Sequence, residues 1–93
     1  MTTPNEFDEK DFWRFIKELE TSDLSDVEKL AQAFGWITGR IVENGQHEVE
    51  LARAMQDKER LVKEQIKLGV MQHARGIFDF CHKQVTGRTA WDD

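Results

Sequence analysis

The chain of 93 residues contains one cysteine, one proline and no tyrosine, and it has no long apolar run. The lone Cys81 excludes an internal disulfide framework and fits a reducing compartment. No apolar stretch approaches the roughly 18 residues of a membrane-spanning helix, and the sequence opens on polar residues rather than on a signal peptide. These absences predict a cytoplasmic protein without membrane association.

Proline breaks helices, and the only one in the chain is Pro4. Much of the remaining sequence consists of Glu, Lys, Arg, Gln, Leu, Met and Ala, the strongest helix formers. The length suits one domain, and 39% apolar residues are enough for a small core. We therefore expect a single all-α domain, a small helical bundle over residues 1–93, in which residues 88–93 form a short C-terminal tail.

The net charge is −5, and the acidity is concentrated at the start of the chain. Residues 1–28 carry nine acidic side chains against three basic ones. Such a field repels nucleic acid and membrane surfaces and attracts basic protein surfaces. The acidic segment is therefore either a solvated face that aids solubility or a patch that binds a basic partner.

Two short helices are predicted in the first half. Thr3 and Glu6 form a capping box around Pro4, and apolar residues at helical spacing follow, which predicts a helix over about residues 4–20. A second capping box at Ser25 and Glu28 opens a helix over about residues 26–43. Asn44-Gly45 is expected to end it.

A row of small residues recurs every fourth position in the second predicted helix, at Ala31, Gly35 and Gly39. Each glycine inside a helix costs about 1 kcal/mol relative to alanine. Close packing against a neighbouring element is the physical reason to keep them, and we expect that element to be the long helix that follows.

The long helix is predicted over about residues 46–86, with Gly87 as its C-cap. It would be roughly 60 Å long at about 1.5 Å per residue. The alternative is a break at Gly69, which would give four helices. Because two short helices cannot cover so long a partner, part of its apolar surface should remain exposed. We expect a two-fold homodimer to bury that surface, and the alternative is a monomer that docks onto another protein.

Metal-ligand candidates are few: His47, His73, Cys81 and His82. On a helix, Cys81 and His82 point about 100° apart, and His73 and Cys81 lie two turns apart. We therefore expect no metal site. Cys81 falls on an apolar stripe and is expected to be a buried, inert thiol, and His73 a half-buried histidine.

Carboxylate pairs are a second chemical possibility, because such pairs hold magnesium in all-helical nucleotide hydrolases. They occur at Glu6/Glu9, Asp8/Asp11 and Asp23/Asp26. These positions fall in first helical turns or in a loop, where acids also serve caps and helix dipoles. No glycine-rich phosphate cradle accompanies them. We expect neither an enzyme nor a cofactor.

Residues 30–38 resemble the first helix and turn of a helix-turn-helix. Ala31 and Gly35 have the four-residue spacing of that motif, and Ile41 matches its apolar position in the second helix. The resemblance implies a small DNA-binding transcriptional regulator that acts through a degenerate helix-turn-helix at residues 30–43. Against it, Glu43 accompanies Arg40 in the recognition segment, whereas DNA readers need basic side chains for the phosphates.

The leading functional prediction is a small acidic, non-enzymatic protein–protein interaction protein, an adaptor or inhibitor of a larger macromolecular complex. Accessory proteins of phages and mobile elements are similar in size and charge, and such a protein would act in the host cytoplasm. Trp91 either folds back onto the core or anchors a partner. The predicted partner-binding residues are Glu6, Asp8, Glu9, Asp11, Trp13 and Trp91.

Overall fold

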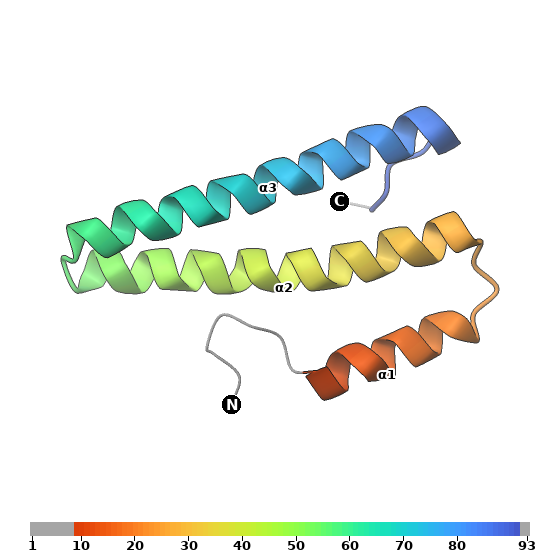
Figure 1. Cartoon of the computed structure of the whole chain (residues 1–93), viewed down its shortest axis with the longest axis horizontal. Helices are drawn as coiled ribbons and strands as arrows, with labels where there is room; N and C mark the ends of the chain where they lie inside the picture. Colours follow the sequence, from red (N-terminus) through yellow and green to blue (C-terminus); the bar gives the residue numbers. More distant parts are fainter. Residues whose placement is uncertain (1–8, 92–93) are drawn as a thin grey trace.

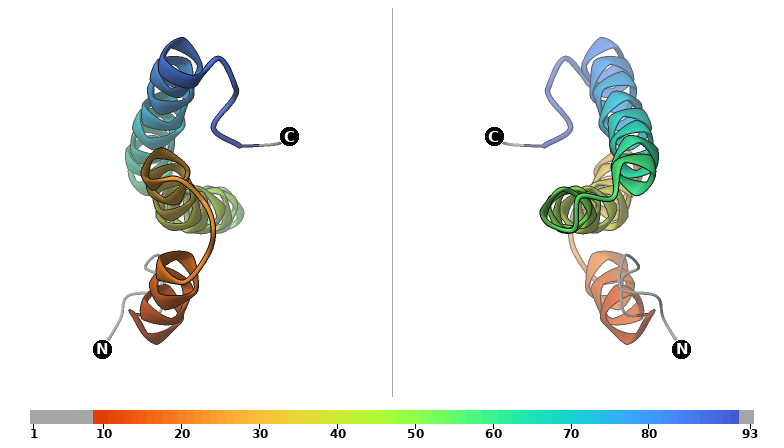
Figure 2. Two further views of the ribbon diagram at one scale, coloured as in Figure 1. Left: turned by 90° about the vertical axis from the view of Figure 1, so that its right-hand side faces the viewer. Right: turned by 90° about the vertical axis from the view of Figure 1, so that its left-hand side faces the viewer.

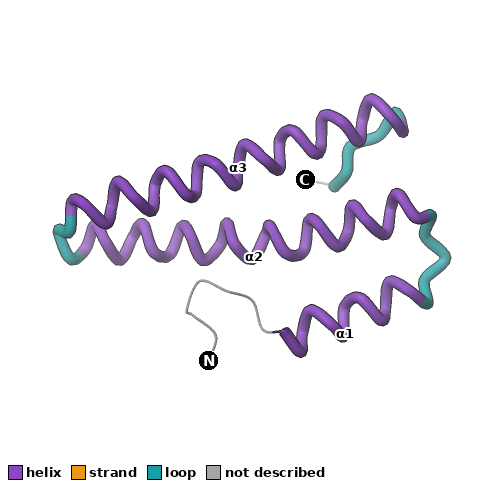
Figure 3. The backbone as a smooth tube through the Cα atoms, viewed as in Figure 1, coloured by secondary structure: helices purple, strands orange, loops and turns teal. Residues whose placement is uncertain are grey.

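The computed structural model describes residues 9–91, and these form three α-helices without a strand (Figure 1). Helix α1 spans Glu9–Glu20, α2 spans Asp26–Ala54 and α3 spans Lys58–Thr86. Figure 3 shows that the loops between them are short. The predicted all-α fold, a small helical bundle, is confirmed. The part of the first predicted helix before Glu9, with the capping box at Thr3 and Glu6, lies outside the described residues.

The predicted boundary between the second and third helices is wrong. Helix α2 continues through Asn44-Gly45 to Ala54, so the expected helices over 26–43 and 46–86 are replaced by two helices of equal length. Gly45 serves packing instead, because a Cβ there would lie 3.2 Å from Cδ1 of Leu68 on α3. Gly69 lies inside α3 and does not break it.

The turn between α2 and α3 is made by polar residues. Gln56 adopts the left-handed conformation with φ 57°, and the backbone N–H of Asp57 donates to the carbonyl of Ala52 at 3.0 Å. The Asp57 carboxylate then accepts from the N–H of Arg60 at 3.1 Å and caps the start of α3. The chain therefore reverses at Gln56 and the Asp57 cap, and not at Gly45, where the sequence predicts the turn.

Two other predicted caps are confirmed. The Ser25 hydroxyl accepts from the N–H of Glu28 at 3.2 Å at the start of α2. Gly87 takes the left-handed conformation with φ 79°, and its N–H donates to the carbonyl of Lys83 at 2.8 Å. A residue with a side chain would be strained at Gly87. The chain can therefore turn back toward α2 after α3 ends.

The three helices form a single layer with α2 in the middle, and α1 and α3 pack on its opposite sides (Figure 2). The molecule measures 47 × 31 × 17 Å. In so thin a layer the core is small, and none of the large side chains in residues 9–91 is completely buried. Rings supply the contacts: Phe15 stacks on Trp36 at 5.6 Å between α1 and α2, and Phe34 stacks on Phe78 at 4.4 Å between α2 and α3.

The row of small residues on α2 does accommodate a close neighbour, but the neighbour is not a helix backbone. A Cβ at Gly35 would lie 2.8 and 2.9 Å from Cε2 and Cδ1 of Trp91, and closer still to its Nε1. A Cβ at Gly39 would lie 3.5 Å from a guanidinium nitrogen of Arg75. The small residues therefore make room for one indole and one guanidinium.

We expect Gly35→Ala to lower the free energy of unfolding by about 1–3 kcal/mol, because overpacking against the indole outweighs the better helix propensity of alanine. Gly39→Ala is the matched control, since a Cβ there would make only an ordinary contact, at 3.5 Å from a guanidinium nitrogen of Arg75. It should raise stability by up to about 1 kcal/mol. Urea unfolding followed by circular dichroism measures both. Equal effects of the two substitutions would contradict the packing described here.

Candidate interaction surfaces

Helix α3 has one face that packs on α2. Leu68 lies over Gly45, Arg75 donates from Nη1 to the carbonyl of Gly35 at 3.0 Å, and Phe78 stacks on Phe34. Because an α-helix turns about 100° per residue, positions separated by three, four or seven residues share a face. The packed face of α3 therefore follows the row Leu68, Met71, Arg75, Phe78 and His82, all at least partly buried.

A second apolar row lies on the other side of α3 and is exposed. Its side chains are 51% to 64% accessible. We call this row the outer stripe, and it consists of Val62, Ile66, Val70, Ile77 and Phe80. The exposed side of a surface helix normally carries the charged residues, whereas a helix that is apolar on both sides is normally buried. Helix α3 is thus suited to lie between two layers of protein, and α2 supplies only one of them.

The remaining positions between the stripe residues are small or uncharged. Gly69, His73 and Gly76 fall on the same side of α3, and no atom lies within 4 Å of a Cβ built at either glycine. The glycines are two turns apart and leave notches in an otherwise bulky row. Contact between this side of α3 and another apolar surface would therefore bury neither a charged side chain nor a bulky polar one at these glycines.

The predicted acidic surface falls on α1 as far as the structure describes it. Glu6 and Asp8 lie outside the described residues, Glu9 is exposed, and Asp11 lies 3.5 Å from Arg14. Trp13 is 59% exposed, with its ring against Phe12 at 5.3 Å. Glu9, Asp11 and Trp13 thus belong to one short helix that packs only on α2 within the described chain.

Trp91 is half-buried and folds back onto α2 and α3, which is the first of the two alternatives for the tail. Its Nε1 donates to the carbonyl of Ala31 at 2.8 Å, and its ring stacks on Phe78 at 5.6 Å. The guanidinium of Arg75 lies over the face of the ring, 4.4 Å from its centroid, in a cation–π contact. This indole holds α2 and α3 together, so it is not an exposed anchor in this structure.

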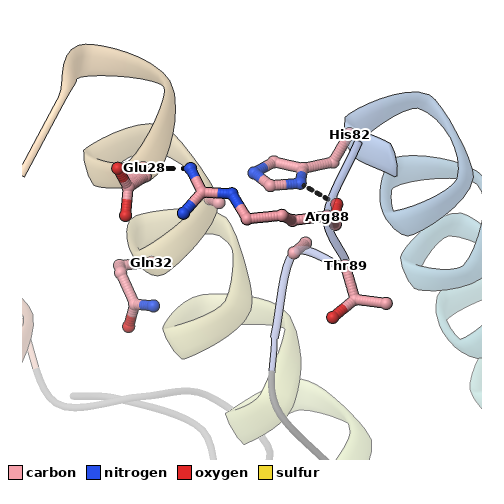
Figure 4. Close-up of a pocket in the computed structure, with 7 residues that line it drawn as sticks. Glu28, Gln32, His82, Arg88 and Thr89 are labelled. Atoms are coloured by element: carbon pink, nitrogen blue, oxygen red, sulfur yellow. Dashed lines mark hydrogen bonds and ion pairs between the residues drawn. The ribbon is translucent and has the colours of Figure 1, made fainter. Parts of the chain in front are cut away.

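The tail also lines an open recess of about 440 Å³ between α2 and α3 (Figure 4). Arg88 reaches across it to within 3.6 Å of Glu28. Nδ1 of His82 lies 2.8 Å from the carbonyl oxygen of Arg88. A carbonyl only accepts, so Nδ1 carries the hydrogen. The buried Nε2 has no hydrogen-bond partner. One imidazole and an ion pair fix the tail, and the recess holds no second carboxylate or thiol for acid–base or nucleophilic chemistry.

The predictions for the other reactive side chains were partly wrong. Cys81 is exposed rather than buried, and His73 is exposed rather than half-buried. The reason is that α3 packs through the row of Phe78 and His82, one position away from Cys81. His82 is instead the buried histidine. Within residues 9–91 no group of three or more His, Cys, Asp or Glu side chains is placed to hold a metal ion.

Helix α2 is continuous through residues 30–43. A helix-turn-helix needs a turn between its two helices, and the structure has none in this segment. Among residues 9–91, no helix has the length and apolarity to cross a membrane. Comparison with protein-family models, curated proteins and solved structures finds no match to this chain.

Proposed function

We propose that this chain is a non-enzymatic protein–protein interaction protein, an adaptor or inhibitor of a larger complex, and that the outer stripe of α3 is a protein interface. The observation that supports the proposal is the outer stripe itself, five large apolar side chains more than half exposed on a helix that is already packed on its other side. Exposed apolar patches of this kind mark protein interaction sites.

The stripe is large enough to matter energetically. Complete burial of a Val, Ile or Phe side chain contributes about 1.5–3 kcal/mol, and roughly half of that remains to be gained where the side chain is already half covered. Five such side chains offer a gross gain of about 5 kcal/mol from this protein alone, before the cost of association. A partner with a matching apolar face would contribute a similar amount.

We further propose that the chain forms a homodimer and that the stripe is its interface. The single-layer fold supports this, because a second copy would cover the apolar face of α3 that lies away from α2. The exposed thiol of Cys81 suits a reducing compartment, and we propose the cytoplasm, the host cytoplasm if a phage or mobile element encodes the protein.

Helix α1 supplies the second proposed surface. Its acidic residues Glu9 and Asp11 and the exposed Trp13 combine charge with a large apolar ring, a combination that suits a basic partner. The variant Glu9→Lys/Asp11→Lys is expected to weaken capture of such a partner, because both attractions become repulsions, while the circular dichroism spectrum stays unchanged. Undiminished capture by this variant would remove α1 from the proposal.

Affinity capture from nuclease-treated lysate of the natural host tests the function. We expect the wild-type chain and Val85→Glu to retain the same stoichiometric protein. We expect Ile66→Glu to retain much less of it, because a chain without its second copy presents one α1 surface instead of two. Val85 is the matched control, because it is also on α3 and 78% exposed but lies outside the stripe. Equal capture by both variants would contradict a role of the dimer in partner binding, and recovery of nucleic acid when the nuclease is omitted would favour the DNA-binding alternative.

A further inference from the structure

On the side of α3 that carries the outer stripe, small and large residues lie at equal distances on opposite sides of His73. Counting away from His73 in both directions, Gly69 is matched by Ile77, and Gly76 is matched by Val70. The next pair is Ile66 and Phe80, both bulky. Each glycine therefore has a large counterpart at the same distance on the other side of His73, and the next pair outward is bulky on both sides.

We propose that the occupant of the stripe is a second copy of the chain, with the two α3 helices antiparallel and crossing at His73 on a two-fold axis. This inference rests on the proposed function, because it specifies how the proposed homodimer is built. An antiparallel two-fold arrangement places position 73 − n of one copy level with position 73 + n of the other. Every glycine then shares its level with a β-branched residue of the second copy.

The alternative parallel arrangement fits the stripe less well. There each residue is level with its own copy, so Gly69 meets Gly69 and Gly76 meets Gly76. The open space above both glycines would remain unfilled, and an unfilled space between packed surfaces weakens association. In the antiparallel arrangement Ile77 and Val70 compensate for the glycines, and the small residues let the helices approach closely at the crossing.

Electrostatics also favours the antiparallel arrangement. Each α3 is a helix of 29 residues with partial positive charge at its N-terminus and partial negative charge at its C-terminus. Antiparallel neighbours place opposite ends together. The positions of α3 that would meet the second copy are the outer stripe together with Gly69, His73 and Gly76. None of them is Asp, Glu, Lys or Arg, so no charged group has to be buried at the crossing. Helices α1 and α2 both lie on one side of α3 (Figure 2), and the stripe is on the side of α3 away from α2, so neither helix lies in the contact.

Disulfide cross-linking tests the arrangement. In a Cys81→Ala background, His73→Cys places a thiol at the two-fold axis, where it meets its own copy. Val62→Cys is the matched control, because it lies on the same stripe 11 positions away, about 16 Å along the helix at about 1.5 Å per residue. In the antiparallel dimer its two copies are therefore about 33 Å apart, far beyond the reach of a disulfide, which needs Cα atoms within about 7 Å.

Under mild oxidation we expect His73→Cys to form a covalent dimer and Val62→Cys to stay uncross-linked, with both variants as helical as the parent. Cross-linking of Val62→Cys as readily as His73→Cys would show parallel pairing and overturn the arrangement. A dimer by sedimentation with neither variant cross-linked would place the interface elsewhere and overturn it as well. A parent chain that sediments only as a monomer would overturn the proposed homodimer as well as its arrangement. Sedimentation of the parent chain therefore distinguishes a wrong arrangement from the absence of a dimer.

Discussion

Replacing Trp91 with alanine is expected to lower the free energy of unfolding by about 3 kcal/mol. This value is at the lower end of the range for truncating large aromatic side chains, because the indole is only half-buried. The loss combines several contacts: the stack on Phe78, the guanidinium of Arg75 above the ring, and the hydrogen bond to the carbonyl of Ala31. A residue in a short C-terminal tail would thus be a principal link between α2 and α3.

Trp13→Ala is the matched control for this experiment. It removes the same side chain from an exposed position on α1, where Phe12 is the ring neighbour at 5.3 Å. We expect a loss below about 1 kcal/mol, in the range of surface substitutions. Urea unfolding of both variants gives the comparison. If Trp91→Ala costs no more than Trp13→Ala, the tail does not hold the hairpin together.

The second large effect is expected from Ile66→Glu. A carboxylate on the outer stripe has to be buried without a partner when α3 meets a second apolar face, and the two-fold dimer buries it twice. We expect the dissociation constant of the homodimer to rise by more than about 100-fold, which corresponds to about 2.7 kcal/mol. The isolated chain should keep its fold, because Ile66 is 61% exposed.

Thermal unfolding at several protein concentrations measures this effect. The unfolding midpoint of an associating protein rises with concentration, because the dimer is favoured by mass action. The wild-type chain and Val85→Glu should show that rise, and Ile66→Glu should unfold at one temperature throughout. A wild-type midpoint that does not depend on concentration would be evidence against the homodimer.

The sequence was sufficient to predict the features that depend on local chemistry. A hydroxyl followed three residues later by a glutamate marked the start of α2, and a glycine after the last apolar residue marked the end of α3. Each cap involves residues within one helical turn, so the pattern and the structure coincide at Ser25 and Gly87.

The reversal between α2 and α3 was not predictable in the same way. Glycine is the usual left-handed residue, so Asn44-Gly45 was the stronger signal, yet Gln56 makes the turn. The polar segment around Gln56 and Asp57 was visible in the sequence, but it is equally compatible with an exposed part of a longer helix. Packing decides between the two, because Leu68 of the antiparallel α3 covers Gly45.

The candidate surface was predictable only in part. The apolar residues of α3 are evident in the sequence, and so is an excess of apolar surface over what two short helices cover. Which of them face outward depends on which row packs on α2, and a shift of one position exchanges Cys81 for His82 as the buried residue. The partner of Gly35 was also hidden, because Trp91 is distant in the sequence and reaches it only through the turn at Gly87.

The central claim is that the outer stripe of α3 is the interface between two copies of the chain. Sedimentation equilibrium of the wild-type chain tests this claim most directly. We predict that the mass rises from the 10.9 kDa of one chain to twice that value as the concentration increases, and that Ile66→Glu stays at 10.9 kDa. A wild-type mass of 10.9 kDa at every concentration would contradict the claim, and so would a dimer that Ile66→Glu leaves intact.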